Sequence, residues 1–130
     1  ISIFAPLLQG KAQINTQNPI QLSNFSEPEP DFFLVKPRKD HYAKEHPTVQ
    51  DILLLVEFSH STYSFDKSIK IPLYAQASIP EAWILNLNED RVEVFKQPVE
   101  GIYREESVFQ PGQEIIFEFL GCTVAVEDFL

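Results

Sequence analysis

The chain has 130 residues, of which 10 are Lys or Arg and 19 are Asp or Glu, so its formal net charge is −9. That length allows one domain and hardly two. A hydrophobic fraction of 44% with 11 Phe excludes an acidic disordered chain. The longest apolar run, residues 52–56, is too short to cross a bilayer, so we expect no membrane association. A single cysteine, Cys122, excludes an internal disulfide framework and favours a cytoplasmic location.

The first half of the chain alternates short apolar segments with polar connections. Residues 1–8 resemble the last turns of a helix, and residues 11–14 and 20–22 are typical of short extended pieces. Two prolines then hold the backbone extended as it enters a predicted buried strand at residues 31–35. The following polar loop, residues 36–50, carries four of the ten cations: Lys36, Arg38, Lys39 and Lys44.

The second half predicts the centre of a sheet and its remaining strands. Residues 51–58 are apolar except at their ends, which indicates a central strand covered on both faces. An amphipathic helix is expected from residue 65 to 77, with a kink or a separate first turn at Pro72. A hairpin at 81–87 and 91–96 and strands at 102–108 and 114–120 follow, whereas residues 124–130 have no clear assignment. The order predicts a mixed α/β sheet. In the predicted helix, the apolar residues at 65, 69, 73, 74 and 77 are expected to form the buried face.

Two carboxylates stand at the ends of neighbouring predicted strands. Asp31 begins the first buried strand and Glu57 lies near the end of the central one. Paired hard oxygen ligands bind Mg²⁺ or Mn²⁺, which polarises a phosphoryl oxygen and activates water. On the pattern alone, solvated acidic side chains at strand ends are the commoner interpretation, since two separated carboxylates form a motif of low specificity.

A lysine on the predicted helix is the next candidate for chemistry. Lys70 follows Asp66 by four residues, a spacing that usually produces an exposed ion pair on a helix surface. Because the helix follows the strand that ends with Glu57, Lys70 could also point back and stabilise charge on a phosphate. His60 lies near Glu57 in the sequence, which leaves hydrolysis of a non-nucleic substrate as a weaker alternative without an evident nucleophile.

Three segments carry a resemblance to a known family. The sequences SEPEPDFFLVKPR, DILLLVEFSHST and KIPLYAQASIPEAWILNL follow one another within residues 18–109. In this order they resemble the Uma family of restriction endonucleases, a branch of the PD-(D/E)XK nuclease superfamily. The resemblance implies a restriction-endonuclease-like mixed α/β sheet core flanked by helices, with a C-terminal β-meander.

The resemblance also implies an active site. Asp31 matches the family's Pro-Asp position and Glu57 its central-strand Glu, which together would bind Mg²⁺ or Mn²⁺. The superfamily's usual lysine stands two residues after that Glu, where this chain has Ser59. Lys70 matches the lysine that the family places on the following helix, and Lys67 is a poorer match. The catalytic set implied is therefore Asp31, Glu57 and Lys70.

The function expected from this set is metal-dependent endonucleolytic hydrolysis of DNA phosphodiester bonds. The alternative is a catalytically degenerate nuclease-fold module that acts in binding or assembly, which the acidic charge favours. The charge also predicts weak non-specific DNA affinity. We further expect a homodimer formed through the strands after residue 81. We expect residues 1–130 to form a single domain that lacks the family's first helix and strand, since the chain contains no Met.

Overall fold

A six-stranded mixed sheet forms the centre of the computed structural model, which describes residues 12–16, 29–40, 42 and 47–128. Neighbouring strands follow the chain order from β1 to β6, and only β3 and β4 pair in parallel. The mixed sheet confirms the predicted fold class. The strands are β1 (Gln13–Thr16), β2 (Phe32–Val35), β3 (Ile52–Ser59), β4 (Glu81–Asn86), β5 (Arg91–Val99) and β6 (Ile102–Phe109).

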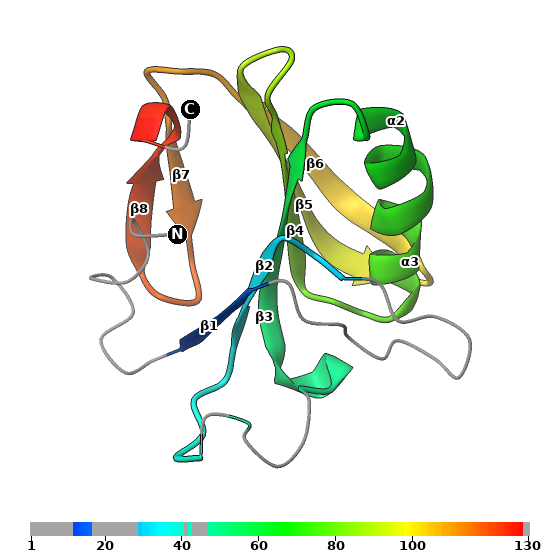
Figure 1. The fold of residues 1–130 in the computed structure, drawn as a ribbon, viewed down its shortest axis with the longest axis vertical. Helices are drawn as coiled ribbons and strands as arrows, with labels where there is room; N and C mark the ends of the chain where they lie inside the picture. Colours follow the sequence, from blue (N-terminus) through cyan, green and yellow to red (C-terminus); the bar gives the residue numbers. More distant parts are fainter. Residues whose placement is uncertain (1–11, 17–28, 41, 43–46, 129–130) are drawn as a thin grey trace.

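Two smaller layers cover the faces of this sheet (Figure 1). On one face lies a continuous helical segment made of α2 (Tyr63–Phe65), the π-helical turn η2 (Asp66–Lys70) and α3 (Ile71–Gln76). On the other lies a hairpin of β7 (Glu114–Phe117) and β8 (Cys122–Ala125), followed by η3 (Val126–Asp128). Each layer closes its own apolar cluster, one around Trp83 and Phe117 and the other around Phe33 and Tyr74.

The structure confirms the predicted central strand. β3 lies between β2 and β4, begins after the short turn η1 (Val49–Asp51), and is buried over its first six residues. Alternate side chains enter the two apolar clusters, so Leu54 faces the hairpin and Leu55 faces the helix. This alternation places Glu57 and Ser59 toward the helical layer.

The predicted buried face of the helix was wrong in its first part, at Phe65 and Ile69, and is confirmed at Tyr74. Phe65 and Ile69 are 53% and 48% exposed, whereas Asp66, Ile71 and Tyr74 are buried. The prediction assumed 3.6 residues per turn, but the π turn η2 adds a residue and rotates the following turn relative to the preceding one.

The irregularity expected at Pro72 occurs one turn earlier. Ile71 donates its backbone N–H to the Asp66 carbonyl, which is the wide π pattern, and Pro72 then occupies the second position of α3. Proline has no backbone N–H, so it is tolerated in the first turn of a helix. The helical segment therefore continues across this position without separating into two helices.

The strands after the helix differ from prediction mainly in their ends. β5 extends to Val99, three residues beyond its predicted end, and its register with β6 is unchanged on both sides of Gln97, which has a positive φ. β7 stops at Phe117, and part of the unassigned segment 124–130 forms the end of β8 and η3. β4, β5 and β6 make the expected meander, while β7 and β8 form a separate two-stranded sheet.

Predictions for residues 1–8 and 20–22 lie outside the described residues. Within the described residues, no helix has the length and apolar character needed to span a membrane.

A buried carboxylate in β4 makes the stability of the fold depend on pH. Glu81 is 8% exposed and accepts the indole N–H of Trp83 at 2.5 Å. Burial raises the pKa of Glu81 to about 7, and the hydrogen bond from Trp83 opposes this only in part. The folded chain thus binds this proton more tightly than the unfolded chain does, so its stability falls as the pH rises through 7.

Glu81→Gln is therefore expected to stabilise the protein by about 2 kcal/mol at pH 8 and by much less at pH 5. The amide keeps an acceptor for Trp83 and removes the buried charge. Urea unfolding at both pH values measures the difference, with Glu89→Gln, at an exposed carboxylate that does not act on Glu81, as the control. An equal gain at the two pH values would contradict the assignment of the raised pKa to Glu81.

Candidate active site

The register of β2 and β3 brings Asp31 to the end of the central strand. Phe32 pairs with Val56, so Asp31, the residue before β2, lies beside the last residues of β3. Its Oδ2 accepts the backbone N–H of Phe58 at 2.7 Å. This bond fixes the carboxylate at the strand end and occupies one of its two oxygens.

Glu57 lies beneath the helical layer, and its two carboxylate oxygens differ in their partners. The side chain is 2% exposed, and its Oε2 lies 2.5 Å from Nζ of Lys70. Its Oε1 is buried and has no hydrogen-bond partner among the described residues. A buried carboxylate oxygen without a partner is costly, which makes it a candidate ligand for a cation or water.

The environment of Glu57 weakens its acidity. Burial raises the pKa of Glu57 to about 7, the Lys70 ammonium lowers it in part, and the charges of Asp66 and Asp31 raise it. Near neutral pH this carboxyl is therefore poised between its two forms. A divalent cation would favour the ionised form because it adds positive charge beside an otherwise unpartnered oxygen.

Lys70 reaches Glu57 from the end of the π turn. Its side chain is 19% exposed, and Nζ also lies 3.8 Å from Oδ1 of Asp66. The interpretation of Asp66 and Lys70 as an exposed surface pair was wrong, because Asp66 is only 3% exposed. The Oδ2 atom of Asp66 accepts the hydroxyls of Ser59 at 2.5 Å and Thr62 at 2.8 Å.

All three predicted catalytic residues line one pocket of about 430 Å³ at this end of β3. His60 and Phe65 lie at the same pocket and are exposed. The backbone carbonyl of His60 accepts the side-chain N–H of Asn88 at 2.5 Å. The complete lining is Asp31, Glu57, Phe58, His60, Ser61, Thr62, Phe65, Asp66 and Lys70. Three carboxylates, including that of Asp66, and one ammonium thus share a solvent-accessible space.

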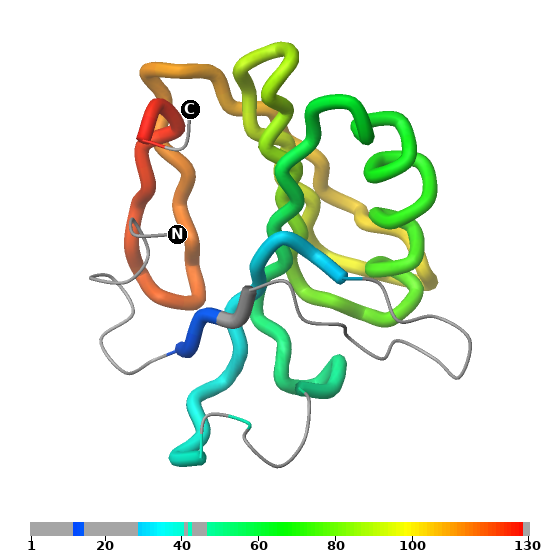
Figure 2. Tube along the Cα trace, viewed as in Figure 1, coloured from blue at the N-terminus to red at the C-terminus, as the bar shows by residue number. Residues whose placement is uncertain are grey.

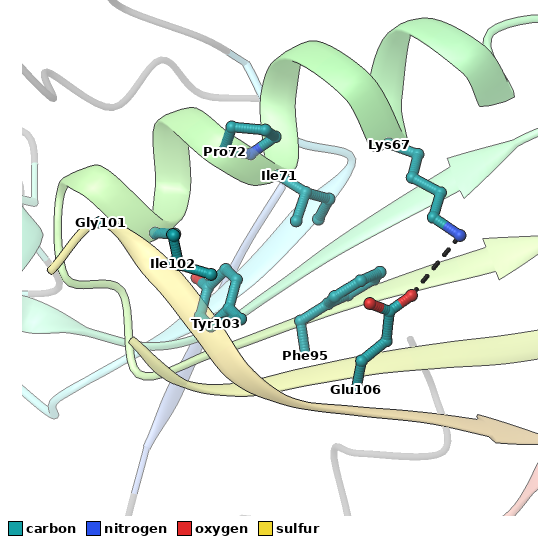
Figure 3. Close-up of a pocket in the computed structure, with 9 residues that line it drawn as sticks. Lys67, Ile71, Pro72, Phe95, Gly101, Ile102, Tyr103 and Glu106 are labelled. Carbon is teal, nitrogen blue, oxygen red and sulfur yellow. Dashed lines mark ion pairs between the residues drawn. The ribbon is translucent and has the colours of Figure 1, made fainter. Parts of the chain in front are cut away.

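Lys67 belongs to a different part of the molecule. Its Nζ lies 3.3 Å from Glu93 and 3.5 Å from Glu106, both on the strands beyond β4. Figure 3 shows it at the end of a second pocket, of about 220 Å³, between the helical segment and the β5–β6 hairpin. Phe95 and Tyr103 form the wall of that pocket opposite the helix. Lys67 therefore fastens the helix to β5 and β6 and does not line the pocket of Glu57.

The donor set suits a hard cation that keeps most of its water. Asp31 and Glu57 each retain one oxygen that makes no described hydrogen bond or ion pair, and oxygen ligands are those that Mg²⁺ prefers. In the described part of the chain, no three His, Cys, Asp or Glu side chains gather closely enough to enclose a metal. Mg²⁺ commonly binds through only one or two carboxylates, so the pair fits this ion.

The cations described in the loop after β2 lie away from the pocket. Asp31 precedes β2, whereas exposed Lys36, Arg38 and Lys39 follow its other end. In Figure 2 this cyan segment leaves at the bottom of the sheet, far from the green helical segment. The four residues of β2 separate the two ends by about 13 Å. These three cations therefore contribute no direct contact to the carboxylate pair.

Sequence reasoning missed Ser59 and Thr62 as partners of the site. The signal was the spacing of Ser59, two residues after Glu57 and hence on the same face of β3. Hydroxyl-rich connections are common, so the pattern could not show that two of these hydroxyls converge on one buried carboxylate.

Comparison with known proteins identifies the family. The sequence model of Uma2, described as "Putative restriction endonuclease", matches residues 1–127. The chain belongs to the Uma2 family. No curated protein sequence matched it.

Among solved structures, the fold is similar to a crystal structure from Anabaena variabilis described as a "putative nuclease belonging to DUF820". The TM-score is 0.72 at 15% sequence identity, and the match covers 98% of this chain and 74% of the other. At that identity the likeness shows the fold alone. For this Uma2 protein, the roles of Asp31, Glu57 and Lys70 stay predictions that rest on the pocket geometry.

Removal of the ammonium leaves Glu57 without its cation. Lys70→Met is expected to destabilise the protein by about 2 kcal/mol at pH 8.5, below the cost for a fully buried pair because Lys70 is partly exposed. The loss is expected to be smaller at pH 5, where Glu57, with its raised pKa, is protonated. Urea unfolding at the two pH values measures it.

The matched control is Lys67→Met, because its partner Glu93 does not share the raised pKa of Glu57. Burial alone would raise the pKa of Glu93, but hydrogen bonds from Tyr63 and Asn86 and the charge of Lys67 lower it overall. Glu93 therefore stays ionised at pH 5. An equal loss for Lys70→Met at pH 5 and pH 8.5 would contradict the proposed pairing with an ionisable Glu57.

Proposed function

We propose that this protein is a metal-dependent endonuclease that hydrolyses DNA phosphodiester bonds. The observation that supports it most is the meeting of Asp31, Glu57 and Lys70 in one pocket, with a buried and unpartnered oxygen on Glu57. The family description and the nuclease-fold neighbour agree with a nuclease.

The two carboxylates would hold Mg²⁺ or Mn²⁺ through the oxygens that no described hydrogen bond or ion pair occupies. When bound, such an ion supplies Lewis-acid polarisation of a phosphoryl oxygen and lowers the pKa of water. Asp31 is already oriented by the Phe58 backbone, and Glu57 is enclosed between β3 and the helix. Little reorganisation of the ligands is therefore needed, which favours tight positioning of the reacting groups.

Lys70 would act on the substrate. Its ammonium stands at the pocket with part of its surface exposed, so it can donate to a phosphoryl oxygen or orient the attacking water. Negative charge increases on the phosphoryl oxygens during displacement, and a fixed cation in a partly desolvated site stabilises it. The three side chains together supply ligands for an ion and a second positive charge.

DNA is proposed as the substrate on the strength of the family description and the phosphate-directed site. With a net charge of −9 and the described cations of residues 36–39 away from the pocket, binding is expected to be weak and favoured by low ionic strength. A homodimer also stays a proposal. Ile102 and Val108 on β6 are 59% and 47% exposed and could lie in such an interface. Light scattering that gives a monomeric mass would contradict it.

Cleavage of plasmid DNA with and without Mn²⁺ tests the proposal. The double variant Asp31→Asn/Glu57→Gln is expected to lose at least about 100-fold in rate, because both charged ligands are removed. Lys70→Met is expected to lose a similar factor while still binding Mn²⁺. The charge-matched control is Glu105→Gln/Glu118→Gln, which removes two exposed carboxylates outside the pocket.

Two outcomes decide between the candidate functions. Equal cleavage by the wild type and the Asp31→Asn/Glu57→Gln variant would contradict the assignment of the site. A wild type that binds neither Mg²⁺ nor Mn²⁺ in calorimetric titration, and cleaves no DNA, would favour the alternative of a degenerate module in binding or assembly.

A further inference from the structure

A buried acidic residue of the helix has no role in the reaction proposed above. Asp66 is 3% exposed, and one of its oxygens accepts two hydroxyls, from Ser59 at 2.5 Å and from Thr62 at 2.8 Å. Its other oxygen, Oδ1, lies 3.8 Å from Nζ of Lys70. The carboxylate thus has one fixed side and one side that faces the ammonium.

The fixed side joins two elements and does not involve Lys70. Ser59 is the last residue of β3, two residues beyond Glu57, and Thr62 is the N-cap of α2. Both hydrogen bonds are charge-assisted, and each such bond is about twice as strong as a neutral one. Together they set the orientation of the carboxylate. Asp66 therefore keeps its place whichever partner Lys70 contacts.

Lys70 needs such an anchor if Glu57 is to bind a cation. In the structure its ammonium lies 2.5 Å from Oε2 of Glu57, where a divalent ion on that carboxylate would repel it. An ammonium on a flexible four-carbon side chain would then turn toward solvent. Asp66 lies one helical turn back along the same side and offers a second negative partner inside the pocket.

We propose that Asp66 is a positioning residue that anchors the Lys70 ammonium inside the pocket independently of Glu57. The ammonium then remains in the pocket when Glu57 binds a divalent cation through its unpartnered oxygen. This inference rests on the proposed function, and it adds Ser59 and Thr62 as the residues that orient the anchor.

Steady-state kinetics of DNA cleavage separates positioning from binding. Asp66→Asn is expected to lower kcat about 10- to 100-fold, as loss of an outer-shell partner does, with KM changed less than about twofold. The double variant Ser59→Ala/Thr62→Ala keeps the negative charge and loses only the orientation of Asp66. It is expected to lower kcat in the same direction by a smaller factor. Glu89→Gln, at an exposed turn, is the charge-matched control.

A double-mutant cycle with Lys70→Met asks whether Asp66 acts through the lysine. Asp66→Asn is expected to cause no further loss of kcat in the Lys70→Met background. An equal loss with and without Lys70 would overturn the inference. So would wild-type kcat in both Asp66→Asn and Ser59→Ala/Thr62→Ala.

The same cycle measured by urea unfolding of the metal-free protein gives a readout that needs no catalysis. Non-additive effects of Asp66→Asn and Lys70→Met support the anchor, and additive effects overturn it. If the wild type neither binds Mn²⁺ nor cleaves DNA, the proposed function fails, and this cycle still decides whether Asp66 holds Lys70. Ser59→Ala/Thr62→Ala, paired with Lys70→Met, serves the same purpose should Asp66→Asn not fold.

Discussion

The ion pair between Glu57 and Lys70 joins the central strand to the helical layer, and the arrangement of the candidate site depends on it. Glu57 is 2% exposed, so the position of its charge requires a cation close by. Lys70 supplies that charge from the end of a π turn. Residues four apart lie on the same side of a helix, so Asp66 and Lys70 both face the sheet.

This pair also explains why the helix exposes apolar residues. Asp66 and Lys70 occupy the side that packs on the sheet, so Phe65 and Ile69 face outward at 53% and 48% exposure. A segment selected only for stability would bury the apolar residues and expose the charges. The reversed arrangement is the kind of local conflict expected at functional sites.

Much of the fold could be predicted because its signals are local. The apolar run at 52–56 indicated the central strand, and the turn before Arg91 indicated the hairpin, with errors only at element ends. The helix face was wrong at Phe65 and Ile69 because a π turn leaves no periodicity in the sequence. The convergence of Ser59 and Thr62 on Asp66 depends on where that turn places the helix, so it could not be predicted.

The candidate site also has parts that the sequence could predict and parts that it could not. The pairing of Asp31 with the end of β3 follows from two antiparallel strands, which the sequence indicated as neighbours. The contact between Lys70 and Glu57 crosses from helix to sheet. The order of strand and helix left this contact as one of two interpretations, and the family resemblance favoured it. Burial of Glu57, which raises its pKa to about 7, is a property of the packed layers and has no sequence signature.

The most direct test of this account is the position of Mn²⁺ in a crystal of the protein, located by its anomalous diffraction. We predict one ion in the pocket, about 2.1 Å from an oxygen of Asp31 and an oxygen of Glu57. Lys70 is expected to have moved from Glu57 toward Asp66. The absence of an ion at the two carboxylates, with Lys70 still paired to Glu57 at a saturating Mn²⁺ concentration, would contradict the account.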